Sequence, residues 1–198
     1  MRPAALLLAL LLALPLAAAG PSLPSSGPVH VKALAVEETP DGFVGTAADV
    51  EATALGGGTG TVYLSTKPLA QTDFQGSARL AARVAGDTLG VDWTQQDYLV
   101  SFRSASTVVG GPSAGADMTL ALTVALHNLL HPEDAWALDD SVAATGTINP
   151  DGTIGPVGGV PAKAEGAAQA GIKTFLYPAG LDKATTQRSN GQGGVQTV

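Results

Sequence analysis

The segment VVGGPSAGADMTLALTVAL (residues 108–126) sets a serine among small residues and continues into a long apolar run. Its spacing predicts a helix from about Ser113 to His131 that packs against a core. Pro112 favours the first helical position, which makes Gly111 the cap and places Ser113 inside the first turn. The Ser113 hydroxyl is then free, with unpaired backbone N–H groups nearby. Serine is also a favoured N-cap, so residue type alone leaves that second interpretation open.

Strands and helices are predicted in irregular order around this segment. Alternation and helical spacing predict strands at 29–38, 43–55, 61–66, 97–104, 141–148 and 172–178, and helices at 72–90 and 161–170. Thr72 or Asp73 is the expected cap of the first of these helices. The glycine loop at 56–60 is predicted to be a hairpin connection, because no Lys-Ser/Thr pair follows it as in a phosphate-binding loop. These elements predict an α+β fold, with a mixed sheet and helices packed on it.

The N-terminus predicts export. Residues 1–19 contain Arg2, an apolar run and a small-residue cleavage site at Ala17–Ala19, which together indicate a signal peptide. We expect a linker at 20–28 and one domain at 29–198, in a secreted or extracytoplasmic protein. The alternative is an uncleaved membrane anchor, although the apolar run is short of the ~20 residues that a span needs.

Composition excludes several classes of partner. The net charge is -7 and no Lys/Arg cluster is present, so nucleic acid is not an expected partner. The chain has 3 histidines without metal-ligand spacing and no cysteine, so neither a metal nor a cofactor is predicted.

A serine nucleophile needs a base to take its proton. His127 and His131 lie further along the same predicted helix, roughly 21 and 27 Å from Ser113, and His30 stands alone in the first strand. A Ser-His-Asp triad is therefore disfavoured. Lys163 falls in the first turn of the helix at 161–170, where the helix dipole and apolar neighbours would favour the neutral amine that a general base requires. A surface lysine with its stem on apolar neighbours is the alternative.

Two segments resemble one known family. GGPSAG at 110–115 resembles the serine motif of the Lon protease proteolytic domain, and ATGTINPDGTIGPVGGVPAKAEGAAQAGIKTFLYP at 144–178 resembles its lysine segment. The resemblance implies a Ser-Lys dyad, with Ser113 as nucleophile and Lys163 as general base, and it implies that Thr145 orients the lysine. Gly111 and Ala114 are the expected supporting residues at the helix start, where N–H groups hold the oxyanion. Family members assemble as rings, so a homo-oligomer acting on protein or peptide substrates is expected.

The sequence also departs from the family pattern. Gly110 replaces an acidic residue before the serine motif, and Thr147 replaces a glutamate. The loop at 131–140 is long for the family, and the chain stops where the family continues through another strand and helix, which leaves open a fragment or a trimmed form.

The function expected from these features is an ATP-independent serine endopeptidase that cleaves unfolded or flexible chains, because the sequence contains no Walker motif. The alternative is a peptide-binding or assembly module on a Lon-like fold that hydrolyses nothing. Another exported Ser-Lys hydrolase, such as a signal-peptidase-like enzyme, is disfavoured because Lys163 follows PVGGV in a predicted helix and the penicillin-binding SxxK signature is absent.

Overall fold

A computed structural model describes residues 23–40, 42–67, 69–105 and 108–181, together with the backbone of 187–189 and 195–197. Of Glu38, Val108 and Val109 the backbone alone is described. The predicted signal peptide at 1–19 lies outside these ranges. Within them, no helix is both long and apolar enough to cross a membrane.

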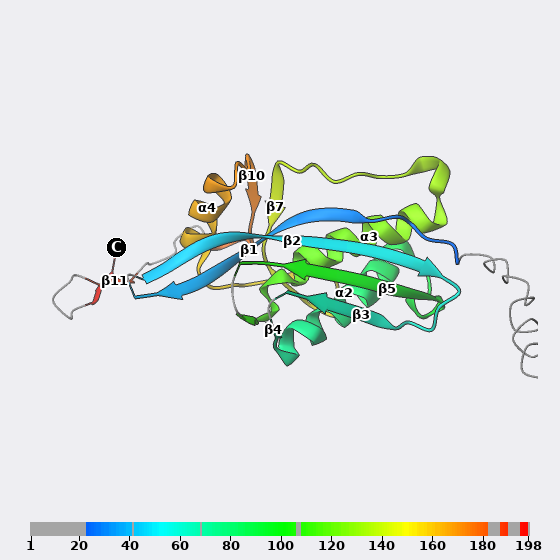
Figure 1. The fold of residues 1–198 in the computed structure, drawn as a ribbon, viewed down its shortest axis with the longest axis horizontal. Helices are drawn as coiled ribbons and strands as arrows, with labels where there is room; N and C mark the ends of the chain where they lie inside the picture. Colours follow the sequence, from blue (N-terminus) through cyan, green and yellow to red (C-terminus); the bar gives the residue numbers. More distant parts are fainter. Residues whose placement is uncertain are drawn as a thin grey trace, which may run out of the picture.

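A six-stranded mixed sheet in the order β10-β7-β1-β2-β5-β3 forms the centre of the molecule (Figure 1). The strands are β1 (Val29–Thr39), β2 (Gly42–Gly56), β3 (Val62–Thr66), β5 (Gln96–Arg103), β7 (Val142–Ala144) and β10 (Thr174–Leu176). β2 pairs antiparallel with β1 and β5, whereas β3–β5, β1–β7 and β7–β10 are parallel pairs. The α+β class with a mixed sheet is therefore confirmed.

Among the described residues, three helices cover the sheet: α2 (Thr72–Leu89), α3 (Gly115–Leu130) and α4 (Val160–Gln169). Short 3-10 turns are η1 (Trp93–Gln95), η2 (Pro112–Ala114) and η3 (Pro132–Asp134). Three small strand pairs complete the described structure: β4 (Leu69–Ala70) with β6 (Val108–Val109), β8 (Thr147–Ile148) with β9 (Ile154–Gly155), and β11 (Gln187–Ser189) with β12 (Val195–Thr197).

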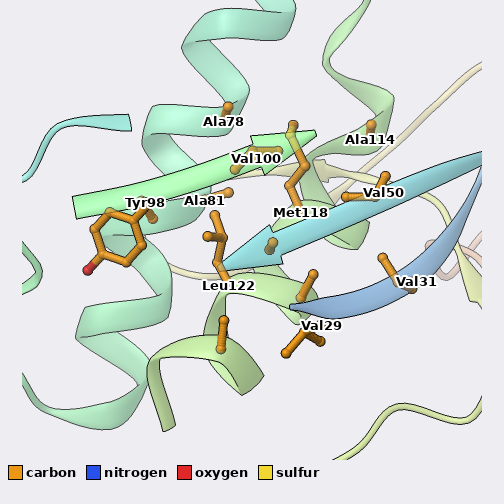
Figure 2. Close-up of a cluster of buried hydrophobic side chains, with 14 of the residues drawn as sticks. Val29, Val31, Val50, Ala78, Ala81, Tyr98, Val100, Ala114, Met118 and Leu122 are labelled. Atoms are coloured by element: carbon orange, nitrogen blue, oxygen red, sulfur yellow. The ribbon is translucent and has the colours of Figure 1, made fainter. Parts of the chain in front are cut away.

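The two faces of the sheet carry different helices. Successive side chains of a strand point to opposite faces, so Ala33 and Leu34 of β1 belong to separate layers. Ala33 joins the large core with α2 and α3, in which Tyr98, Met118 and Leu122 are fully buried (Figure 2). Leu34 packs instead with Ala167 of α4, in a smaller second cluster. α3 and α4 therefore approach the sheet from opposite sides.

Two details of the predicted elements are wrong. The glycine loop at 56–60 does not close a hairpin, because β5 lies between β2 and β3 and pairs with both. Neither Thr72 nor Asp73 caps α2, whose N-cap is Gln71 without a side-chain hydrogen bond.

The predicted strand at 141–148 is broken into β7 and β8. Thr145 and Gly146 interrupt it because their backbone groups bond to other elements: Thr145 N–H donates to Leu176 O at 2.9 Å, and Gly146 N–H donates to Ser113 O at 3.1 Å. The expected linker at 20–28 is also bonded to the domain in its described part, since Ser26 N–H donates to Ala54 O at 3.0 Å.

α4 touches β2 backbone to backbone. A Cβ at Gly45 would overlap the carbonyl of Ala162, and a Cβ at Gly166 would lie 2.5 Å from the carbonyl carbon of Gly45. The two glycines therefore set how closely α4 approaches the sheet.

We expect Gly45→Ala to lower the free energy of unfolding by about 2 kcal/mol, because the added methyl group overpacks a backbone contact that has no flexible side chain to yield. Chemical denaturation measures this change. Gly76→Ala is the control: it lies on the exposed side of α2 with nothing within 4 Å of the new methyl group, and it should stabilise the helix by roughly 0.5–1 kcal/mol. Equal effects of the two substitutions would contradict the close-contact interpretation.

Candidate active site

Ser113 lies in η2, immediately before α3. Gly111 is the N-cap of this turn with φ 77°, and Pro112 is the first helical residue, as predicted from the sequence. Neither η2 nor α3 has a side-chain cap, so the interpretation of Ser113 as an N-cap is wrong. Its half-buried side chain lines a pocket of about 680 Å³.

Asp73 of α2 is bonded to the loop that precedes Ser113 (residues 110–112). Asp73 accepts a hydrogen bond from Gly111 N–H at 2.9 Å. The side chain of Gln71 occupies the space in which a Cβ of residue 110 would lie. The positive φ that requires glycine is at Gly111 and not at Gly110. The loop thus has a carboxylate partner even though Gly110 replaces the acidic residue of the family pattern.

Lys163 is buried in the first part of α4, with 3% of its surface exposed. Its Nζ donates a hydrogen bond to Thr145 Oγ1 at 2.8 Å. Burial lowers the pKa of the amine to about 8, and the negative charge of Asp117 opposes this shift. A lysine with a pKa of about 8 carries the neutral amine that a general base requires in about one molecule in ten at pH 7, and in more as the pH rises. The interpretation of Lys163 as a surface lysine is wrong.

Thr145 connects the lysine to the serine segment. It follows β7 directly, is buried, and its hydroxyl donates to the carbonyl oxygen of Ser113 at 3.3 Å. The next residue, Gly146, donates its N–H to the same oxygen at 3.1 Å and accepts from Ala116 N–H at 3.0 Å. Three hydrogen bonds thus fix the end of β7 against the start of α3.

Ser113 and Lys163 face the same pocket from opposite layers of the fold. They can meet because β1 continues past the end of β7, which leaves Ala35 and Val36 of β1 at the pocket wall. No hydrogen bond between described residues joins the Ser113 hydroxyl directly to Lys163. Catalytic hydrogen bonds are often absent or long before substrate binds, so the arrangement is compatible with proton transfer from Ser113 to Lys163.

The two proposed supporting residues have different environments. The N–H of Gly111 is bonded to Asp73, so it is unavailable to an oxyanion. Ala114 lies at the start of α3, where the first backbone N–H groups have no partner within the helix. Thr147, which replaces a glutamate of the family pattern, also lines the pocket.

Sequence reasoning missed Asp117. This residue lies one helical turn after Ser113 and is 0% exposed; neither carboxylate oxygen has a hydrogen bond of good geometry among the described residues, although the backbone N–H of Ala144 is near enough to lower its pKa. Burial raises its pKa well above the usual value, and the positive charge of Lys163 opposes this. A signal was available, since an acid within the apolar run ADMTLAL is unexpected on a buried helix.

The histidines lie elsewhere. His30 Nδ1 is 3.7 Å from Glu51 on the surface. His127 stacks on Trp136, with ring centroids 3.5 Å apart, and its Nε2 lies 2.9 Å from the carbonyl of Asp134. These contacts hold the loop at 131–140 against α3. In the part of the chain that the structure describes, no group of three or more His, Cys, Asp or Glu could hold a metal ion.

Residues 81–187 match the family model of the Lon protease (S16) C-terminal proteolytic domain. This match spans more than half of the chain, which therefore belongs to that family. The chain is 31% identical over 135 residues to the Lon protease of Elusimicrobium minutum. These aligned residues make up 68% of the chain and 15% of that relative. It is 38% identical over 90 residues to the archaeal Lon protease of Methanothermobacter thermautotrophicus (46% and 13%), and 32% over 91 residues to Lon protease 2 of Bacillus subtilis (46% and 15%). The matched part is at most 15% of the length of these relatives.

Burial of Lys163 predicts a pH-dependent stability. The folded-state pKa of about 8 lies below the ordinary 10.5, so the amine destabilises the fold as the pH falls from about 10.5 through 8. The stability of Lys163→Met relative to the wild type should therefore be on the order of 3 kcal/mol higher at pH 7 than at pH 11.

Urea unfolding at the two pH values measures this difference. The exposed Lys67→Met is the control and should show no change of that size. A stability difference between Lys163→Met and the wild type that is equal at both pH values would show that folding does not lower the pKa of the amine.

Proposed function

We propose that this chain is a serine endopeptidase in which Ser113 is the nucleophile and Lys163 the general base. The observation that carries the proposal is a buried lysine, with a pKa lowered to about 8, on the same pocket as a serine at a helix start. A serine hydroxyl is a weak nucleophile without an adjacent base, and Lys163 is the buried amine that faces Ser113.

The proposed reaction has two halves. In the first, Ser113 Oγ bonds to the scissile carbonyl carbon while its proton passes to the Lys163 amine. The resulting ammonium returns this proton to the leaving amine as the C–N bond breaks, which leaves an acyl-enzyme. In the second, a water molecule attacks the ester, Lys163 takes and returns the proton, and the carboxylic acid product leaves Ser113.

Two other parts of the site support these steps. Thr145 accepts one N–H of Lys163, which orients the nitrogen and leaves its remaining positions for the Ser113 proton. The backbone N–H groups of Ser113 and Ala114 at the helix start are the proposed oxyanion donors, where the helix dipole favours negative charge.

The proposed substrates are unfolded or flexible protein segments, cleaved without ATP. Every group in the reaction above belongs to the chain itself or to water, and no step consumes a nucleotide. The pocket is bordered by the apolar side chains of Val36, Phe74 and Phe102, against which an extended segment can lie. Assembly into a ring remains a prediction.

Hydrolysis of casein, an unfolded protein, tests this function. Without ATP, we expect the wild type to cleave, and Ser113→Ala and Lys163→Met each to reduce kcat/KM by on the order of 10³-fold or more. The wild-type kcat/KM should rise with pH through about 8, because the free amine is the active form. ATP should not increase the rate.

The matched controls are Ser65→Ala and Lys67→Met, which alter the same residue types at exposed positions in and beside β3. They should keep full activity. If the folded wild type cleaves nothing but binds casein, the proposal fails in favour of a peptide-binding module. If activity survives in Ser113→Ala, the nucleophile is another group.

We also propose that residues 1–19 direct export and are removed. The support is the order of Arg2, an apolar run and small residues at 17–19. Expression of the full sequence in a bacterial host, followed by N-terminal sequencing of the extracytoplasmic fraction, should find a chain that begins at Gly20. An intact N-terminus in the membrane fraction would instead indicate an anchor.

A further inference from the structure

The peptide between Gly110 and Gly111 is the least restrained part of the loop before Ser113. Both residues lack a Cβ, so rotation of the peptide between them meets little steric resistance. Pro112 has no backbone N–H, which makes Gly111 N–H the last backbone donor before Ser113. The orientation of this peptide therefore depends on what the N–H of Gly111 contacts.

That contact is the carboxylate of Asp73. Its Oδ2 accepts Gly111 N–H at 2.9 Å and its Oδ1 accepts Phe74 N–H at 2.8 Å, so both oxygens are engaged. Because the N–H and C=O of a trans peptide point in opposite directions, the first bond also turns the Gly110 carbonyl away from Asp73. A hydrogen bond to a carboxylate is stronger than one between neutral groups. The bond thus selects one of the orientations that two glycines allow.

The start of α2 holds Asp73 in place. The neighbouring Phe74 is 0% exposed and packs edge-to-face on Phe102, with ring centroids 5.0 Å apart. Before α2, β4 pairs in parallel with β6, the strand that leads into the loop. A Cβ at Gly110 would overlap the side chain of Gln71, so the glycine lets the loop lie against the start of α2. The loop is therefore bonded to a well-packed element.

The orientation of the peptide reaches Ser113 through one residue. Pro112 has a fixed φ, so a rotation at Gly111 carries over to the backbone of Ser113. On its other side Ser113 is already fixed, since its carbonyl oxygen accepts from the Thr145 hydroxyl and from Gly146 N–H. A nucleophile displaced by about 1 Å can lose roughly a hundredfold in rate. The bond to α2 supplies the restraint on the side of Ser113 that these hydrogen bonds leave free.

We propose that Asp73 is a positioning residue: by fixing the Gly110–Gly111 peptide, it holds Ser113 in the orientation in which its hydroxyl attacks the substrate. This inference rests on the proposed function. The residue of α2 that lines the pocket is Phe74, so Asp73 acts through the loop and not on the substrate. Its effect should therefore appear in the rate of the chemical step and not in substrate binding.

The first test measures kcat and KM of Asp73→Ala and Asp73→Asn with a chromogenic peptide substrate. We expect kcat of Asp73→Ala to fall at least about tenfold, with KM within about twofold of the wild type, because the loop loses its restraint. Asp73→Asn keeps an oxygen that can accept Gly111 N–H, so it should restore most of the activity. Asp73 is exposed and alanine is a strong helix former, so the variants should fold.

Asp87→Ala is the matched control. It removes an exposed carboxylate at the other end of the same helix, where Oδ2 lies 3.5 Å from Arg83 Nε, and it should leave kcat and KM unchanged. An unchanged kcat in Asp73→Ala would overturn the inference. So would an equal loss in Asp73→Asn, because an effect of charge alone needs no bond to Gly111. A raised kcat in Asp73→Ala would also overturn it, since the carboxylate would then be withholding Gly111 N–H from the oxyanion.

A measurement without substrate separates this inference from the proposed function. In isotope-labelled protein with backbone-based NMR assignment, the Gly111 amide proton should resonate further upfield in Asp73→Ala, which lacks the acceptor, and near the wild-type position in Asp73→Asn. This shift in a protein that cleaves nothing would establish the restraint on the loop and reject the peptidase. A Gly111 resonance that does not move in Asp73→Ala of an active protein would reject the inference and leave the peptidase standing.

Discussion

The carbonyl oxygen of Ser113 is the junction on which the rest of the site depends. It accepts hydrogen bonds from the Thr145 hydroxyl and from Gly146 N–H, and Ala116 N–H returns a bond to Gly146 O. These bonds fix the start of a helix on one face of the sheet against the end of a strand within it. Because Thr145 also accepts from Lys163, the helix on the opposite face is tied to the same junction. Ser113 and Lys163 are thereby held by one dipeptide, Thr145–Gly146.

Close packing of small residues makes this junction possible. A Cβ at Gly115 would lie 2.8 Å from the backbone nitrogen of Ile148, so the glycine of the serine motif lets α3 approach β8. Gly45 and Gly166 do the same for α4 on β2. Protein interiors transmit small displacements because they are densely packed, and an added methyl group at any of these contacts would separate Ser113 from Lys163. Gly115 and Gly166, which belong to the two motifs, are therefore required for close packing, whatever their part in the chemistry.

Electrostatics and stability oppose each other at this site. Burial of Lys163 and Asp117 removes two charges from water, which destabilises the fold and shifts both pKa values toward the neutral forms. The same shifts leave a lysine able to act as a base near neutral pH. The family pattern places an acid just before the serine motif, whereas this chain has Gly110 there and holds the loop through Asp73 of α2. Its buried carboxylate lies after the serine, at Asp117.

The sequence by itself determined the class of fold, most helices and strands, the cap at Gly111 and the two motifs, because these depend on local spacing and on residue types with strong preferences. It did not determine that β5 lies between β2 and β3, or that Thr145 and Gly146 leave the sheet, because strand order and backbone partners come from residues far apart in the chain. The burial of Lys163 likewise required the structure, since alanines and glycines surround buried and exposed lysines alike. Asp117 shows the limit most clearly: its distance from Ser113 is local, but the positive charge of Lys163, which lowers its pKa, comes from a helix on the other face of the sheet.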